Sequence, residues 1–380
     1  MALAGRGYVA PLTSCDLITG SKDSFVKMWN TSTGQCVHTL QGHMDAVNAV
    51  AYSPDRGFIA SGSSDTTVKV WNAKTGRKHC TFAEHRDEVM SVSFSWDGSR
   101  VLSGGKDAMA IIWATGSGQC VPPGCLRAHA ASVTCSAWAP KHPELEAPMI
   151  VTGSADRTAK AWSSMGVHCL DLQGHQDEVT AVAWAPDGSH MATASEDGTA
   201  MVWKWTSLST ECVATLIGHD DAVTSVAFSP DSQWVATGGA DGSALIFNLQ
   251  GQLLQAMKGH DGEVTSLAFS PDGRQIATGS SDYTARIWPS VRGSLQDDMY
   301  IILDDCEQLL EGHEDSVTSV AWRPEAKGPE LAPDQGPAEP EDPLAHELRG
   351  YGGKASAKDL PAAKDMDEYK KDPMAWLDKL

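Results

Sequence analysis

The chain has 380 residues, of which 41% are hydrophobic, and its formal net charge is −20 at pH 7. This length allows one large domain or two ordinary ones with a sizeable core. Because a strongly acidic protein is repelled by phosphate backbones and acidic lipid headgroups, we expect neither nucleic acid nor a membrane as its partner. The sequence contains no run of about 18 apolar residues, so we predict no membrane-spanning helix.

The start of the chain lacks the apolar stretch of a secretory signal. Its nine cysteines include no Cys-x-x-Cys pair, which favours free thiols in a reducing compartment. We therefore expect a cytoplasmic protein and leave a nuclear, cytoskeletal or ciliary location open. Five cysteines lie at one place in a repeat, which predicts small buried side chains there: Cys36, Cys120, Cys169, Cys212 and Cys306.

A repeat of about 42 residues runs through most of the chain. Each unit has a His, a Ser or Thr, an Asp four residues later and an aromatic residue six residues after that. His to Asp spans 22 residues in five of six complete units, and the remaining unit carries five extra residues within 139–149. The units contain His43, Ser61, Asp65, Trp71; His85, Ser103, Asp107, Trp113; His129, Thr152, Asp156, Trp162; His175, Thr193, Asp197, Trp203; His219, Thr237, Asp241, Phe247; and His260, Thr278, Asp282, Trp288.

Each unit reads as four short strands separated by turns. In the first unit these strands are expected at 47–53, 58–61, 67–71 and 77–82. A turn signal such as Ser-Pro-Asp closes the first strand, and Gly-rich segments close the others. Short strands at this regular spacing predict an all-β protein, and the period is typical of propeller blades.

This pattern resembles the WD40-repeat family over about residues 13–323. The family's Trp-Asp dipeptide is never complete, because Asn follows Trp29 and Trp71 and Pro follows Trp288. The resemblance implies a seven-bladed β-propeller in which the four recurring residues form structural tetrads. It also implies that partners dock on the face around the ring axis.

The two ends of the repeat region carry complementary halves of one unit. The N-terminal part supplies Thr19, Asp23 and Trp29, and the C-terminal part supplies His313 with a strand over 317–322. We predict that segment 313–322 joins three strands within 15–40 to complete the seventh blade, which removes an exposed sheet edge. The alternatives are an eighth, incomplete blade or an N-terminus trimmed of its first strand.

His, Ser and Asp are also the residues of a hydrolytic triad. A triad needs one activated nucleophile and an oxyanion hole, whereas this trio recurs seven times. Indole, hydroxyl, imidazole and carboxylate groups satisfy one another's hydrogen bonds, so the trio is interpreted as structural. We predict no enzyme activity, no cofactor and no metal site. We also predict that the Phe247 unit, which lacks an indole N–H, is the loosest blade.

The family's docking face comprises three positions per blade. None of these 21 residues is aromatic or Arg, and only Met90 is large and apolar. The candidate contacts of a basic segment of a partner are four glutamates together with Met90 and Thr180: Glu88, Glu178, Glu196 and Glu263. The alternative is a solvated acidic rim that binds nothing.

Two further segments stand apart from the repeat. Trp288 and His313 are separated by 25 residues instead of 13 to 16, and the apolar run 300–303 is expected to lengthen a fourth strand or form a docking edge. Residues 1–323 are predicted to be the propeller and 324–380 an acidic, Pro-rich linker and tail. Within 369–380, Trp376 predicts a short linear motif, unless the tail packs onto the propeller or stays loose.

The sequence favours a non-catalytic scaffold or adaptor: a monomeric propeller within a multiprotein complex, in a cytoskeletal or ciliary setting. One alternative is a substrate receptor of a ubiquitin ligase, although the family's Trp-Asp-x-Arg docking motif is absent. The other is an enzyme with a site on the axial face. That face offers no His, Asp or Cys among its 21 positions.

Overall fold

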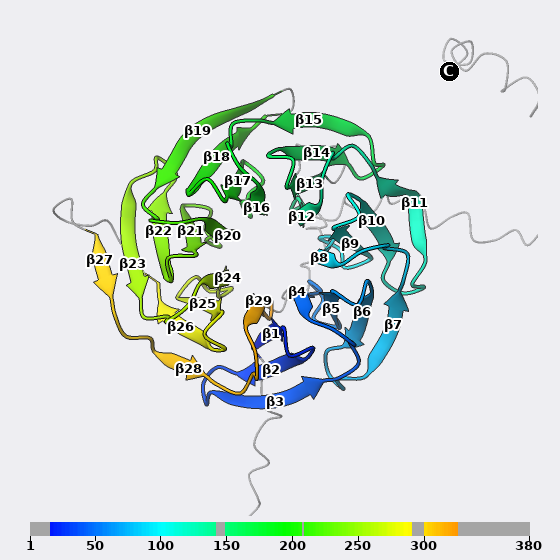
Figure 1. Cartoon of the computed structure of the whole chain (residues 1–380), viewed down its shortest axis with the longest axis horizontal. Helices are drawn as coiled ribbons and strands as arrows, with labels where there is room; N and C mark the ends of the chain where they lie inside the picture. The colour runs from blue at the N-terminus through cyan, green and yellow to red at the C-terminus, as the bar shows by residue number, and fades with distance from the viewer. Residues whose placement is uncertain (1–15, 142–148, 207–208, 291–299, 326–380) are drawn as a thin grey trace, which may run out of the picture. The chain divides into compact units, whose positions relative to one another are not determined.

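The structure, a computed structural model, describes residues 16–141, 149–206, 209–290 and 300–325. Within these ranges the chain forms strands and no helix. The strands make seven sheets, which stand as blades around a common axis (Figure 1). The predicted all-β, seven-bladed propeller is confirmed.

Blades 1 to 7 are numbered here in chain order, each from its innermost strand outward. Blades 1 to 4 contain β4 (Val47–Tyr52), β5 (Phe58–Ser63), β6 (Val68–Asn72), β7 (Lys78–Phe82); β8 (Val89–Phe94), β9 (Arg100–Gly105), β10 (Ala110–Ala114), β11 (Cys120–Leu126); β12 (Val133–Trp138), β13 (Met149–Ser154), β14 (Ala159–Ser163), β15 (His168–Leu172); and β16 (Val179–Trp184), β17 (His190–Ser195), β18 (Thr199–Trp205), β19 (Thr210–Ile217).

Blades 5 to 7 follow the same plan. They contain β20 (Val223–Phe228), β21 (Trp234–Gly239), β22 (Ser243–Asn248), β23 (Leu253–Lys258); β24 (Val264–Phe269), β25 (Gln275–Ser280), β26 (Ala285–Pro289), β28 (Gln308–Leu310); and β29 (Val317–Trp322), β1 (Leu17–Ser21), β2 (Val26–Asn30), β3 (Gln35–Leu40).

Blade 7 closes the ring with strands from both ends of the repeat region. Its innermost strand, β29, pairs antiparallel with β1, so that Leu17 faces Trp322 and Thr19 faces Val320. The two strands lie side by side in Figure 1. The predicted closure is confirmed, and the described residues leave no eighth blade.

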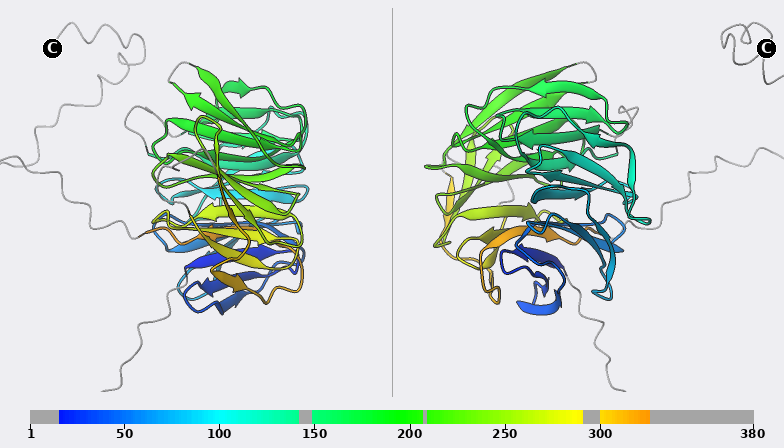
Figure 2. Two further views of the ribbon diagram at one scale, coloured as in Figure 1. Left: turned by 90° about the vertical axis from the view of Figure 1, so that its left-hand side faces the viewer. Right: turned by 45° about the vertical axis from the view of Figure 1, so that its right-hand side comes forward.

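The core lies between the blades. Seven clusters of buried residues each join two neighbouring sheets. In β6, Val68 and Val70 pack towards blade 2, whereas Trp71 packs towards blade 7. Because both faces of every blade are covered, the blades stack into the disc that Figure 2 shows from the side.

The recurring cysteines are not buried, so that prediction is wrong. Cys36, Cys169 and Cys212 are exposed, and Cys120 and Cys306 are half-buried. Four of the five lie on the outermost strand of a blade, and Cys306 lies two residues before one. This strand has solvent on its outer edge instead of a neighbouring sheet, so its side chains are less covered than those of the inner strands.

The segment between the third and fourth strands of blade 6 does not lengthen its own fourth strand, which corrects another expectation. Strand β28 has only three residues. The preceding β27 (Ile301–Leu303) pairs in parallel with β23 and becomes a fifth strand of blade 5. This crossing pairs backbone groups along an edge of β23 that would otherwise be open. Residues 291–299 and 326–380, which include Trp376, lie outside the described residues.

Candidate functional site

The tetrads form hydrogen-bonded chains that link each loop before an innermost strand to the turn between the second and third strands. In blade 1, His43 Nδ1 lies 2.8 Å from Asp65 Oδ2 and His43 Nε2 lies 2.7 Å from Ser61 Oγ. The Trp71 indole donates to the same hydroxyl at 2.8 Å. The structure brings the corresponding residues together in every blade, apart from the missing indole in blade 5.

The tetrad hydroxyls are hydrogen-bonded and buried within the blades. A carboxylate only accepts, so a neutral His43 donates through Nδ1 to Asp65 and accepts through Nε2 from the Ser61 hydroxyl. The seven Ser and Thr residues of the tetrads are at most 1% exposed. A substrate could not reach these oxygens without opening the blade, so the tetrads hold the fold together.

The tetrads also predict how stability depends on pH. Burial lowers the pKa of His43 and His129 below the usual value, despite their carboxylate partners. The unfolded chain therefore binds more protons than the folded chain as the pH falls below about 6.5. Burial would raise the pKa of Asp156, but hydrogen bonds from Thr158, Ala130 and His129 lower it to about 2, so its stabilising effect is lost only below about pH 4.

We therefore expect the free energy of unfolding to fall between pH 7 and pH 5, and to fall further below pH 4. Urea denaturation followed by circular dichroism over this range measures the change. A His129→Gln variant is expected to show a smaller loss between pH 7 and pH 5. An equal loss in the variant would mean that other groups cause the dependence.

Blade 5 carries the incomplete tetrad. His219 Nε2 lies 2.9 Å from Thr237 Oγ1, but Phe247 has no N–H to donate to that hydroxyl. Phe247 is 1% exposed, and its ring packs against Gly218 as the Trp71 ring packs against Gly42 in blade 1. The Thr237 hydroxyl therefore lacks the second partner, the indole N–H, that the corresponding hydroxyls have in the other blades.

A Phe247→Trp substitution is expected to raise the free energy of unfolding by about 1 kcal/mol, because it supplies this donor. The reverse change in blade 1, Trp71→Phe, should lower it by about 1–2 kcal/mol. Both are measured by urea denaturation of the full chain. If both substitutions destabilised the protein equally, the indole hydrogen bond would not explain the difference between the blades.

The docking-face residues form pairs across each blade. The residue before the first strand accepts a backbone hydrogen bond from the residue before the tetrad Asp, as Glu178 O does from Glu196 N at 3.0 Å. In blade 2 the same pair is Glu88 and Lys106, whose side chains form a salt bridge of 2.9 Å. The charge of Glu88 is therefore neutralised, whereas blade 4 places two carboxylates together.

The Glu178 and Glu196 carboxylates interact unfavourably. Burial, followed by the negative charges of Glu178 and Asp177, raises the pKa of Glu196. A nearby cation would relieve this repulsion. Glu263 and Asp261 of blade 6 both line a hollow of about 400 Å³.

Thr180 and its counterparts connect neighbouring blades. The Thr180 hydroxyl donates to Val223 O of blade 5 at 2.5 Å. Equivalent bonds to the next blade are made by Thr134, Thr224, Thr265, Thr318 and, through its amide, Asn48. Met90 has no such donor, and its sulfur receives a contact of 3.9 Å from Asn48 Nδ2. The Thr180 hydroxyl is thus engaged within the ring.

The sequence reasoning missed a second set of acidic residues on this face. An Asp follows the tetrad His by two residues in five of seven units, and its carboxylate caps the next backbone N–H, as Asp177 does for Glu178 at 2.9 Å. The recurring His-x-Asp spacing in the sequence could have identified these residues. We define the acidic arc as the acids of blades 4 to 6 that lie one to three residues after the tetrad His or directly before the tetrad Asp: Asp177, Glu178, Glu196, Asp220, Asp221, Asp261 and Glu263.

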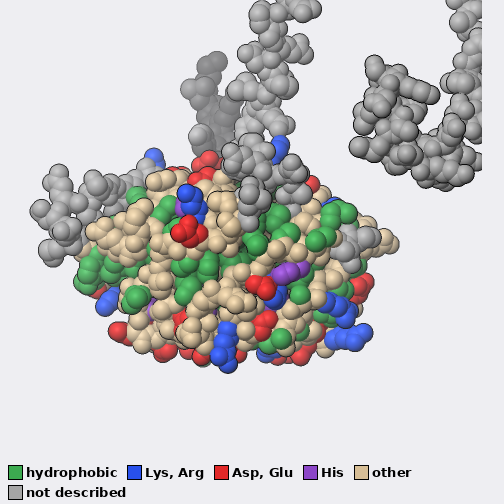
Figure 3. Space-filling model, turned by 90° about the horizontal axis from the view of Figure 1, so that it is seen from above, with side chains coloured by type: hydrophobic (Ala, Val, Ile, Leu, Met, Phe, Trp, Pro, Cys, Tyr) green, Lys and Arg blue, Asp and Glu red, His purple; other side chains and the backbone are tan. Residues whose placement is uncertain are grey.

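The propeller offers no other obvious chemical centre. Among the described residues, no three or more His, Cys, Asp or Glu side chains are grouped to hold a metal ion. No described helix could span a membrane. Seen from its edge, the propeller shows apolar side chains on its rim, and acidic side chains line the lower border of the view (Figure 3).

A family model described as "WD domain, G-beta repeat" matches residues 34–72, 76–114, 120–163, 166–204, 210–248 and 251–289. The chain belongs to the WD40 repeat family. These matches cover six repeats, and the seventh blade of this WD40 protein is the one assembled from both ends of the repeat region.

Several curated WD40 relatives match parts of the chain. "Nuclear distribution protein PAC1" of Coccidioides posadasii is 27% identical over 53% of this chain and 36% of its own length. "Coronin-7" of Pongo abelii is 42% identical over 17% of this chain and 7% of its length. "Small ribosomal subunit protein RACK1y" of rice, Oryza sativa subsp. japonica, is 38% identical over 22% of this chain and 24% of its length.

The chain thus spans about a third or less of the length of these relatives. None of the three printed names is that of an enzyme. The family and its relatives fit a protein-interaction scaffold, and they indicate no catalytic family.

Proposed function

We propose that this WD40 protein is a non-catalytic scaffold whose acidic arc binds a basic segment of a protein partner. The observation that carries the proposal is the Glu178–Glu196 pair, in which two carboxylates meet while the Glu88 charge is neutralised by Lys106. A basic segment would relieve this repulsion, and its long-range attraction would speed association.

The charge distribution narrows the expected contact to blades 4 to 6. At the positions that form the acidic arc, these three blades carry seven acids and no Lys or Arg. Blade 2 instead combines Glu88 with Lys106, and blade 7 contributes Lys22. Glu178, Glu196 and Glu263 therefore remain candidate contacts, with Glu88 and Met90 at the margin of the site.

The proposed setting is a multiprotein complex in the cytoplasm, in which a monomeric propeller holds its partner. Cytoskeletal and ciliary assemblies are the settings to test first. Segment 369–380 with Trp376 is proposed as a second, separate attachment for a partner. Truncation before residue 326 separates the two contributions.

The test is fluorescence polarisation with a labelled peptide of eight alternating Arg and Ser residues. The double variant Glu178→Lys, Glu196→Lys should bind it at least about tenfold more weakly than the wild type at low salt. The matched control Glu211→Lys, Asp305→Lys makes the same change of net charge at exposed rim positions and should retain most of the affinity. Equal losses in both variants would show that only net charge matters and would contradict the proposal.

A further inference from the structure

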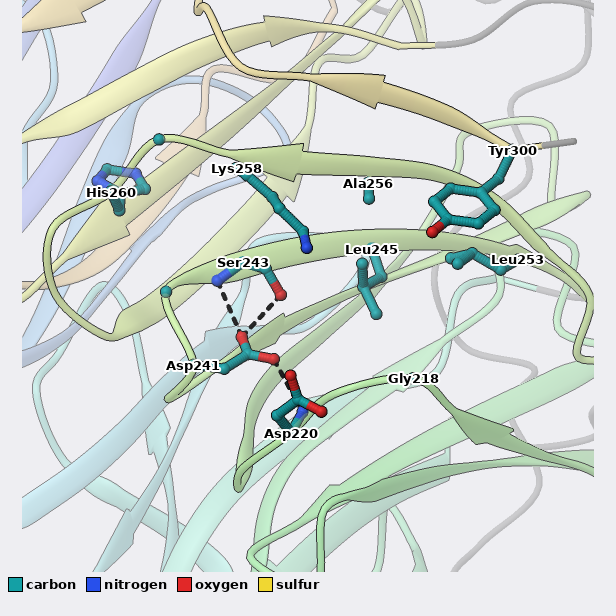
Figure 4. A pocket seen from close by; sticks show the side chains of 12 residues that line it. Gly218, Asp220, Asp241, Ser243, Leu245, Leu253, Ala256, Lys258, His260 and Tyr300 are labelled. Carbon is teal, nitrogen blue, oxygen red and sulfur yellow. Dashed lines mark hydrogen bonds between the residues drawn. The ribbon is translucent and has the colours of Figure 1, made fainter.

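A cavity of about 190 Å³ lies beside blade 5, where the loops that precede β20 and β24 approach the turn between β21 and β22. Its lining combines the carboxylates of Asp220 and Asp241 with Leu245, Leu253 and Tyr300 (Figure 4). Drug-sized ligands occupy pockets of about 300–1,000 Å³, so this cavity has the size for a single side chain.

In several other blades the position that corresponds to Leu245 holds a basic side chain of the protein itself, whereas blades 2 and 4 hold Ile111 and Met201 there. The position two residues before the tetrad aromatic holds Lys27, Lys69, Lys160 and Arg286 in four of the seven blades. Lys69 Nζ lies 3.6 Å from Asp65 Oδ2, and Arg286 Nη2 lies 3.8 Å from Asp282 Oδ2. In these two blades the tetrad carboxylate therefore has its own cation.

Blade 5 has Leu245 at this position, so no cation comes from its third strand. The Asp241 side chain is 15% exposed, compared with 8% for Asp65 and 10% for Asp282. Asp241 still accepts hydrogen bonds from His219 and Ser243, as the other tetrad carboxylates do from their partners. What it lacks is a cation from its own third strand, and the open space lies where that charge would be, lined also by Lys258 of β23.

The apolar half of the cavity suits the alkyl stem of a long basic side chain. Leu245, Leu253 and Ala256 line it from β22 and β23, and the ring of Tyr300 stands beside them (Figure 4). Tyr300 precedes β27, so the crossing of the chain from blade 6 to blade 5 brings this ring to the cavity. Lys and Arg commonly lay their stems on apolar surface while their charged ends reach polar groups.

We propose that this cavity binds one Lys or Arg side chain of a protein partner, with its stem against Leu245 and Tyr300 and its charge near Asp241 and Asp220. The inference rests on the proposed function in one respect, because both call for a basic partner. The cavity adds a defined anchor next to the acidic arc, since it and the hollow beside Glu263 share Asp241, Gly242 and His260.

The first test uses a single residue as the probe, so that the acidic arc contributes little. N-acetyl-arginine N-methylamide is titrated into the full chain, and the Leu253 methyl signals are followed by NMR. Saturable shifts are expected with this probe and not with its neutral analogue, N-acetyl-citrulline N-methylamide. Equal shifts with both probes would overturn the proposal.

Leu245→Lys is the sharpest variant, because it installs the side chain that Lys69 provides in blade 1. The variant should fold, since four blades already accept a basic residue at this position, and its own lysine should reduce binding of the arginine probe at least about fivefold. The control Val213→Lys adds the same charge at an exposed position of β19 outside the cavity and should bind the probe as the wild type does. Undiminished binding by a folded Leu245→Lys variant would overturn the proposal.

Lys258 also lines the cavity (Figure 4). Its replacement distinguishes a basic occupant from an acidic one. Lys258→Ala should strengthen binding of the arginine probe, because it removes a competing charge. If N-acetyl-aspartate N-methylamide shifted the Leu253 methyl signals and Lys258→Ala abolished this effect, the site would be an anion site and the proposal would fail. Glu178→Lys, Glu196→Lys should leave arginine binding intact, so the failure of this proposal is distinguishable from the failure of the acidic arc.

Discussion

A chain that ends at Ser316 is expected to lose its cooperative fold, because it lacks the strand that closes the ring. Val317 and Val320 of β29 are 0% and 5% exposed in the cluster between blades 6 and 7. Burying such a side chain contributes about 1.5–3 kcal/mol, and the hydrogen-bonded ladder to β1 is lost as well. The total, at least about 5 kcal/mol, is comparable with the whole stability of a typical domain.

The matched control ends at Glu325 and keeps β29 intact. Urea denaturation, followed by circular dichroism, should give this control the same unfolding midpoint as the full chain. The chain ending at Ser316 should show no cooperative transition, or one at a much lower urea concentration. Similar midpoints for both truncations would mean that β29 does not hold the ring together.

Asp65→Ala is expected to cost about 3–5 kcal/mol, because one carboxylate serves several donors, among them the buried His43 ring. Asp65 accepts from His43 Nδ1 at 2.8 Å, from the Met44 backbone at 3.0 Å and from the Thr67 hydroxyl at 2.6 Å. Lys69 also lies near it. Alanine leaves each of these donors without its acceptor, and water can reach only some of them.

The control for this prediction is Asp55→Ala, which removes an Asp from a turn on the other side of the same blade. Asp55 also accepts hydrogen bonds, from Ser53 Oγ and from Gly57 N at 2.9 Å, but solvent can replace them in this exposed turn. Its expected cost is about 0.5–1 kcal/mol. Urea denaturation compares the two variants, and equal costs would contradict the structural role assigned to the tetrads.

The sequence was sufficient to predict the features that depend on local spacing. Four residues from Ser61 to Asp65 and six more to Trp71 recur so regularly that the blades and the closure through His313 follow from them. Propeller blades contact mainly their neighbours in the chain, so a periodic pattern determines most of the core.

Features that depend on contacts between distant segments could not be predicted in this way. Glu88 and Lys106 were both identified, but their salt bridge depends on how the loop before β8 meets the turn after β9. The parallel pairing of β27 with β23 joins segments that the repeat does not relate. The exposure of Cys36 follows from its place on an outermost strand, which its recurrence alone does not reveal.

The cavity beside blade 5 shows how a departure from the repeat can mark a candidate site. Leu245 and Phe247 both differ from the basic and Trp residues of blade 1, and together they distinguish the outer part of blade 5. Either change alone could be read as ordinary core variation. Comparison of the blades in three dimensions shows that Leu245 leaves the Asp241 carboxylate without a cation from its own third strand, beside an open cavity.

The most direct test of the scaffold function is affinity capture from native lysate with the full chain and with its Glu178→Lys, Glu196→Lys variant, read by quantitative mass spectrometry. The rim variant Glu211→Lys, Asp305→Lys serves as the control for net charge. The account predicts a set of proteins with basic segments that the wild type and the rim variant retain and the acidic-arc variant loses. If all three captured the same proteins in the same amounts, the acidic arc would not be the binding surface.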